Sequence, residues 1–246
     1  MITQAFATGP ALIGYLTLGD GGLDYSLSSA LALVEGGVDL LEVGLPFSDP
    51  IADGPVIQKA MERSLKAGTK TEDLIAFLHA FRKKSQVPIV IFSYFNPILT
   101  AGLAFLERAH KAGANGILIV DAPYEHIPQT SLDPILVVAT STPQERLEKI
   151  VKKGRGFIYY ACQKGTTGMR TGLPPHSASD IARIKQVSCL PVAIGFGISS
   201  KETAKEAIQH ADGVVVGSYF VDAMGRRASA EEIVQLVKDI DPRRVL

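Results

Sequence analysis

Two acidic residues stand where a buried strand gives way to a loop, in the stretch VDLLEVGLPFSDPIADGPV from Val38 to Val56. Glu42 interrupts the apolar strand, and Asp53 lies near the end of the proline-containing loop that follows. The two positions are too far apart for one helix face, but a strand end and its following loop can point into one pocket. Together they would form an acid–base pair. The structural alternatives are an ion-pair partner for Glu42 and a turn-forming role for Asp53.

The elements that must position this pair are short apolar strands alternating with amphipathic helical segments, the pattern of an α/β fold with a parallel sheet. A weak repeat joins helix ends to strand starts at Gly36–Asp39, Ala112–Asn115 and His210–Gly213. Eight such units close a barrel whose active site lies at the C-terminal ends of its strands. The sequence therefore predicts a single-domain (β/α)8 TIM barrel over residues 1–246, with strands at Ala11–Thr17, Leu40–Leu45, Val87–Phe92, Gly116–Asp121, Pro134–Ala139, Gly156–Cys162, Leu190–Ile194 and Gly213–Val216.

One βα unit is abbreviated. Between Asp121 and Pro134 the chain reads APYEHIPQTSLD, which is too short and too rich in proline for a full crossover helix. We therefore expect the barrel wall to be thin at this point. After the third strand, Asn96-Pro97 is predicted to form a turn before a helix at Leu103–Ala112.

Glycine-rich turns follow the last three predicted strands: Gln163 to Gly168, Gly195 to Ser200, and Gly217-Ser218. Glycine lets backbone N–H groups approach a phosphate, and a helix N-terminus adds partial positive charge. Barrel enzymes commonly hold a phosphate at the loops after strands seven and eight. The spacing therefore predicts a phosphate-bearing small-molecule substrate.

Charge and composition narrow the function classes. The 246 residues carry 25 basic and 25 acidic side chains, and the short basic clusters are dispersed, so we expect neither nucleic-acid nor membrane binding. No apolar run reaches the roughly 18 residues that span a bilayer. The two cysteines form no close-spaced motif and the five histidines show no metal-ligand spacing, so we expect no metal site and a reducing, cytoplasmic location.

The string LLEVGLPFSDPIADGP closely resembles the signature of the tryptophan synthase α subunit family, whose members split indole-3-glycerol phosphate into indole and glyceraldehyde 3-phosphate. The resemblance extends from about Gly14 to about Met224. It implies that Glu42 is the proton shuttle, that Asp53 steadies the indole N–H, and that this chain needs no cofactor. The family's other site residues map onto Tyr159 as a further catalytic residue, onto Tyr15, Tyr94, Thr167 and Phe196 for the substrate, and onto Gly168, Gly197, Gly217 and Ser218 for the phosphate.

The resemblance also implies a partner. The family's α subunit joins a β subunit that carries pyridoxal phosphate and consumes the indole, in an expected α2β2 assembly. The loop holding Pro46, Asp49 and Pro50 normally forms part of that contact. With three prolines and a polar tip, this loop is expected to make few packing contacts of its own, and to become ordered when substrate and partner bind.

Departures from the family pattern keep two alternatives open. The residues before Thr167-Gly168, beginning at Cys162, do not match the family, and Thr140 stands where proline is typical. These differences raise the alternative of a catalytically weak chain that acts mainly as an allosteric activator of the β subunit. The phosphate loops alone would also suit another phosphate-binding barrel, such as a sugar phosphate isomerase, although the string around Glu42 and Asp53 argues against it.

Overall fold

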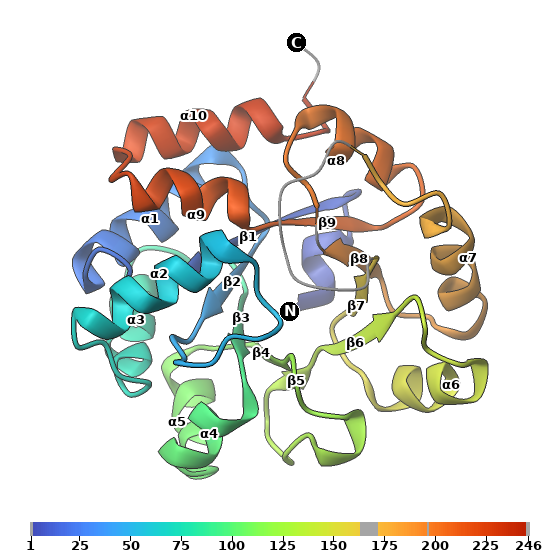
Figure 1. The fold of residues 1–246 in the computed structure, drawn as a ribbon, viewed down its shortest axis with the longest axis horizontal. Helices are drawn as coiled ribbons and strands as arrows, with labels where there is room; N and C mark the ends of the chain where they lie inside the picture. The colour runs from blue at the N-terminus through green and yellow to red at the C-terminus, as the bar shows by residue number, and fades with distance from the viewer. Residues whose placement is uncertain (1, 163–171, 196, 245–246) are drawn as a thin grey trace.

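The computed structural model describes residues 2–162, 172–195 and 197–244, and its strands form a parallel barrel enclosed by helices (Figure 1). The strands pair in the order β5-β4-β3-β2-β1-β9-β8-β7-β6. Every residue of β1 and β2 is buried, because one face of each strand packs inside the barrel and the other lies under helices. The predicted (β/α)8 barrel is thus confirmed, with strands β1 (Ala11–Thr17), β2 (Leu40–Gly44), β3 (Ile89–Ser93), β4 (Gly116–Ile119), β5 (Asp133–Pro134), β6 (Leu136–Ala139), β7 (Ile158–Ala161), β8 (Val192–Gly195) and β9 (Gly213–Val216).

The barrel closes through one kinked strand, which the sequence predicts as a single element from Pro134 to Ala139. In the structure it is divided at Ile135 into β5, which pairs with β4, and β6, which pairs with β7. The N–H of Ile135 still donates to the carbonyl of Ile117 in β4, and pairing with β7 begins at Leu136. The described strand segments therefore correspond to the eight predicted units, with β5 and β6 counted as one.

The helices form an outer ring with one gap, as Figure 1 shows between α5 and α6. There the connection holds only the 3-10 turn η2 (Tyr124–His126), which confirms that a full crossover helix is missing. Another 3-10 turn, η1 (Ile2–Phe6), closes the N-terminal end with its fully buried Ile2. The remaining helices are α1 (Leu23–Gly36), α2 (Pro55–Lys66), α3 (Asp73–Arg82), α4 (Phe95–Ala101), α5 (Ala104–Ala112), α6 (Gln144–Lys153), α7 (Ser177–Val187), α8 (Lys201–Ile208), α9 (Ser218–Gly225) and α10 (Ala230–Ile240).

The predicted turn at Asn96-Pro97 is wrong, because both residues lie in the first turn of α4. Proline is tolerated there, since the first N–H groups of a helix have no partner within the helix. The N–H of Phe95 is bonded instead to the Asp121 carboxylate at 2.8 Å. The proline that suggested a turn therefore begins a helix.

The weak sequence repeat marks a recurring hydrogen-bond arrangement at the N-terminal end of the barrel. Asp39, Asn115 and Asp212 each accept a backbone N–H near the start of the neighbouring strand, at 2.8 to 2.9 Å. Each also accepts a hydrogen bond from a basic side chain, namely Arg243, Arg82 and Lys185 respectively. These contacts fix the strands at one end and leave the opposite end available for a site.

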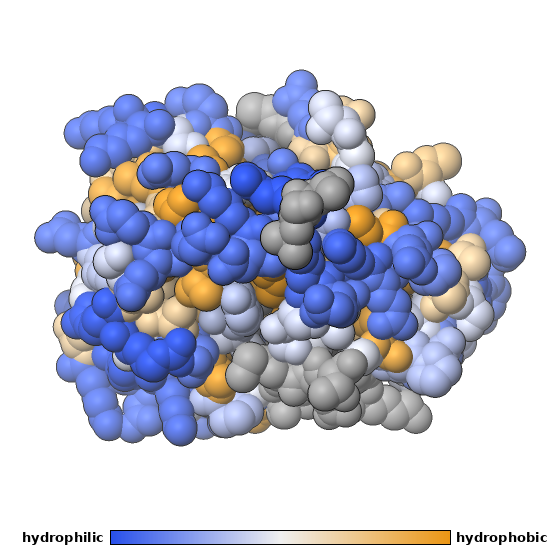
Figure 2. Space-filling model, turned by 90° about the horizontal axis from the view of Figure 1, so that it is seen from above, coloured by the Kyte–Doolittle hydropathy of each residue, from blue (hydrophilic) through white to orange (hydrophobic). Residues whose placement is uncertain are grey.

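The surface is mixed in character. On the face in Figure 2, hydrophilic residues predominate and hydrophobic ones lie between them in small separate areas. Among the described residues, three large apolar side chains are at least half exposed: Ile51 at 77%, and Leu99 and Leu103 at 52% each. No helix in the described part of the chain is both long and apolar enough to cross a membrane.

Candidate active site

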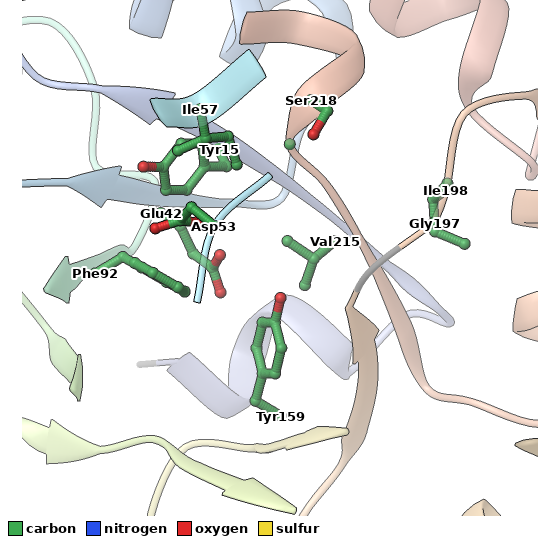
Figure 3. Close-up of a pocket in the computed structure, with 11 residues that line it drawn as sticks. Tyr15, Glu42, Asp53, Ile57, Phe92, Tyr159, Gly197, Ile198, Val215 and Ser218 are labelled. Carbon is green, nitrogen blue, oxygen red and sulfur yellow. The ribbon is translucent and has the colours of Figure 1, made fainter. Parts of the chain in front are cut away.

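A small cavity of about 40 Å³ opens at the C-terminal ends of the strands. Figure 3 shows that its side chains come from strands, from the loop after β2 and from the beginnings of α2 and α9. One part of the wall is acidic, one aromatic and aliphatic, and one rich in glycine. The lining residues are Tyr15, Glu42, Asp53, Ile57, Phe92, Tyr159, Gly197, Ile198, Val215, Gly217 and Ser218.

Glu42 lies on β2 with its side chain completely buried. Neither carboxyl oxygen has a hydrogen-bond partner among the described residues. Burial disfavours the charged form and raises the pKa of Glu42 to about 8. An unpaired buried carboxyl group is costly to the fold, so its presence in a cavity points to a function.

Asp53 lies in the loop before α2 and is 2% exposed. Burial raises its pKa to about 6, while a hydrogen bond from the Tyr94 hydroxyl, at 2.6 Å from Oδ2, acts in the opposite direction. Asp53 is also buried, but the hydrogen bond from Tyr94 lowers its pKa, whereas Glu42 has no hydrogen-bond partner among the described residues.

Tyr94 does not occupy the position expected of a substrate contact. It is fully buried and lies outside the cavity lining, behind Asp53. Its hydroxyl oxygen accepts the N–H of Ala52 at 3.0 Å, and its ring packs on Phe47 with centroids 5.1 Å apart. The loop is thus anchored at several points, so the expectation that it makes few packing contacts is wrong. Tyr94 thus supports Asp53, and a direct contact of Tyr94 with the substrate stays a prediction.

Two tyrosines and Phe92 form the aromatic wall. Phe92 makes edge contacts with Tyr15 and Tyr159, at centroid distances of 5.5 and 6.5 Å. The tyrosine hydroxyls fit over glycines of neighbouring strands: a Cβ on Gly44 or Gly195 would lie only 2.0 Å from the hydroxyl of Tyr15 or Tyr159 respectively. Figure 3 shows the Tyr159 hydroxyl directed toward the middle of the cavity, and both tyrosines line it; their roles toward a substrate stay predictions.

The glycine-rich part of the wall contains three of the predicted phosphate ligands. Gly217 precedes α9, Ser218 is its first residue, and Gly197 has a φ of +85°, which favours glycine. The first N–H groups of α9 have no acceptor within the helix and suit an anion. The predicted residues Thr167, Gly168 and Phe196 lie outside the described residues.

The predicted partner-facing residues differ in exposure. Asp49 is exposed and Pro50 is half-buried, so both offer surface. Pro46 is buried, and its place at a partner interface stays a prediction.

Four apolar lining residues were not identified from the sequence: Ile57, Phe92, Ile198 and Val215. Phe92 and Val215 lie near the C-terminal ends of β3 and β9, and Ile57 lies in the first turn of α2. Their position near the end of a barrel strand could have marked Phe92 and Val215 as lining residues. From sequence alone, however, an apolar residue at such a position cannot be distinguished from a residue of the hydrophobic core.

The separated pKa values define the chemistry that is available. Between about pH 6 and pH 8, Glu42 is mainly protonated and Asp53 mainly ionised. A proton donor and a fixed negative charge therefore face the same apolar space, with an anion-binding helix end at its edge. Among the described residues, no group of three or more His, Cys, Asp and Glu side chains could hold a metal ion.

Comparisons with known proteins agree with this arrangement. A family model described as the tryptophan synthase alpha chain matches residues 3–241. The tryptophan synthase alpha chain of Coxiella burnetii (strain CbuK_Q154) is 45% identical over 248 residues, covering 98% of this chain and 97% of that protein. That of Chlamydia felis (strain Fe/C-56) is 44% identical over 254 residues, covering 99% of each.

Solved structures give the same result. A structure of Mycobacterium tuberculosis tryptophan synthase has a TM-score of 0.89 at 34% identity, covering 97% of this chain and 96% of that chain. A mutant tryptophan synthase alpha-subunit from Pyrococcus furiosus has a TM-score of 0.86 at 35% identity, covering 94% and 98%. The resemblance seen in the sequence is thereby confirmed, and the chain belongs to the tryptophan synthase alpha chain family.

Proposed function

We propose that this chain cleaves indole-3-glycerol phosphate to indole and glyceraldehyde 3-phosphate by a retro-aldol reaction, as the lyase of a tryptophan synthase. The observation that carries this proposal is the buried, unpaired carboxyl group of Glu42, facing the same cavity as Asp53. Family membership supports it over the sugar phosphate isomerase alternative. The presence of both carboxyl groups in the cavity favours catalysis over a purely regulatory role.

Each proposed step follows from the ionisation of the two acids. Protonated Glu42 donates its proton to indole C3, and the ring nitrogen becomes positively charged, next to the Asp53 carboxylate. The Glu42 carboxylate then accepts the proton of the side-chain hydroxyl on the carbon bonded to C3. The C3–carbon bond breaks, its electron pair restores the neutral indole ring, and the hydroxyl carbon becomes the aldehyde. Glu42 ends protonated, as it began.

The remaining walls position the substrate. The aromatic and aliphatic residues suit a flat bicyclic ring, and the beginning of α9 with Gly197 suits the phosphate. The binding energy of the phosphate lies away from the reacting bond and holds that bond against Glu42. Tyr159 would contribute a hydroxyl group to the middle of the cavity.

Family membership implies a β-subunit partner, and we propose an α2β2 assembly in the cytoplasm in which the β subunit carries pyridoxal phosphate and consumes the indole. Exposed Asp49, half-buried Pro50 and the largely exposed Ile51 lie on the loop that also holds Asp53. A partner on this surface would reach the catalytic loop directly. We expect cleavage to rise at least about tenfold when the β subunit is added.

The decisive experiment is an assay of indole release from indole-3-glycerol phosphate by the purified chain, with and without its β subunit. Glu42→Gln keeps the shape of the side chain but cannot exchange a proton, and should lower turnover by about 10²–10⁴-fold. Glu206→Gln, an exposed change on α8, is the matched control. Turnover of Glu42→Gln within a few-fold of wild type would remove Glu42 from this role.

A further inference from the structure

The loop that carries Asp53 is held from two sides. On one side, the Tyr94 hydroxyl binds the Asp53 carboxylate and accepts the N–H of Ala52. On the other side, the side-chain amide of Gln58 on α2 donates to the backbone carbonyl of Asp53 at 2.8 Å and to that of Pro50 at 3.4 Å. The side chain of Gln58 therefore extends from α2 back to the loop that precedes this helix.

The two anchors restrain different parts of Asp53. Tyr94 restrains the carboxylate, but a carboxylate can rotate about its own side chain while it keeps one hydrogen bond. Gln58 restrains the peptide group that follows Asp53, and so fixes the direction in which the side chain leaves the backbone. Its second contact, at Pro50, holds the other end of the same short segment.

We propose that Gln58 is a positioning residue for Asp53, and that its amide donor keeps the Asp53 carboxylate aimed into the cavity. The inference rests on the proposed function, because it assigns Gln58 to the same reaction. Gln58 itself is exposed and does not line the cavity. Its effect is on the geometry of catalysis, where a small displacement of a reacting group is costly.

The chain offers variants that separate positioning from stability. Gln58→Glu has almost the same shape, but its carboxylate cannot donate and repels both loop carbonyls. Near the N-terminus of α2, a negative charge is favourable to the helix, so this change should not weaken the fold. Gln58→Met removes the donor without adding charge, and Gln58→Arg keeps N–H donors. Gln235→Met on α10 is the matched control, since the hydrogen bond that this glutamine makes within the described part of the chain goes to an exposed aspartate, Asp239, in the same helix.

The first measurement is steady-state cleavage of indole-3-glycerol phosphate by the full chain with its β subunit. We expect kcat to fall about tenfold in Gln58→Glu and several-fold in Gln58→Met. KM should be nearly unchanged, because neither substitution alters the residues proposed to bind the phosphate. Gln58→Arg should recover most of kcat, and Gln235→Met should match wild type. If Gln58 contributed only to the stability of α2, Gln58→Glu should leave kcat unchanged, because a negative charge is favourable near the start of that helix. Wild-type kcat in both Gln58→Glu and Gln58→Met would overturn the inference.

The second measurement does not depend on the reaction. Amide hydrogen exchange at residues 51–54 should accelerate in Gln58→Glu, while exchange along the rest of α2 stays as in wild type. Unchanged exchange at these residues would overturn the inference even if the wild-type chain cleaved no substrate. Absence of cleavage by the wild type would instead refute the proposed function.

Discussion

Replacement of Glu42 by Gln should change the pH dependence of stability in a way that isolates one buried carboxyl group. The pKa of Glu42 is raised from 4.5 to about 8 in the folded chain because burial disfavours the charged form. The folded state therefore holds this proton more tightly than the unfolded state. Its contribution to stability is fully present below about pH 4.5 and is lost as pH rises toward about 8.

The magnitude follows from the pKa difference. Each pH unit between the two pKa values costs about 1.4 kcal/mol, so stability should fall by about 3 kcal/mol from pH 5 to pH 8 through this group alone. The amide side chain of the Glu42→Gln variant has no proton to lose in this range. The packing cost of the buried amide is the same at every pH, so it adds only a constant to the stability difference between the two proteins. The titration of Asp53 affects both proteins alike and cancels from that difference.

The assay is urea unfolding of wild type and Glu42→Gln at pH 5, 6, 7 and 8. We expect the variant to gain stability relative to wild type by about 3 kcal/mol across this range. The exposed substitution Glu206→Gln should give a difference that stays within about 0.5 kcal/mol at every pH. A flat difference for Glu42→Gln would show that Glu42 ionises in the fold near its ordinary pKa, and the acid role would lose its physical basis.

Further predictions concern the reaction and the barrel. The rate profile should be bell-shaped, rising through about pH 6 as Asp53 ionises and falling through about pH 8 as Glu42 loses its proton; a profile flat from pH 5 to pH 9 would contradict both assignments. In Tyr94→Phe the pKa of Asp53 should rise, since the lost hydrogen bond had lowered it, and the acidic limb should move to higher pH. Gly197→Val should raise KM at least about tenfold, because the side chain is strained at positive φ and blocks backbone donors; normal calorimetric binding of a phosphate-bearing analogue would place the anion elsewhere. Asn115→Ala removes hydrogen bonds to a strand N–H and an arginine, and should cost about 1–3 kcal/mol in urea unfolding without changing kcat.

Much of the fold was readable from local patterns. Apolar runs of four to seven residues between amphipathic segments predicted the barrel, because backbone periodicity and burial on both faces act over short stretches. The bounds of β1 and β9 were predicted to the residue. Both departures from the predicted elements lie at prolines: Pro97 lies in the first turn of α4, and the strand predicted from Pro134 is divided into β5 and β6.

The candidate site divides in the same way. The sequence by itself determined that Glu42 lies on a buried strand, that Asp53 follows in its loop, and that Gly197 and Gly217 stand after later strands, since these facts are local. The tertiary structure decided how acidic the two carboxyl groups are, because a pKa depends on burial and on neighbours that folding brings near. Tyr94, which binds Asp53, is 41 residues away in the sequence. Closure of the barrel removes water and hydrogen-bond partners from Glu42, and that loss of solvation turns an ordinary glutamate into a proton donor near neutral pH.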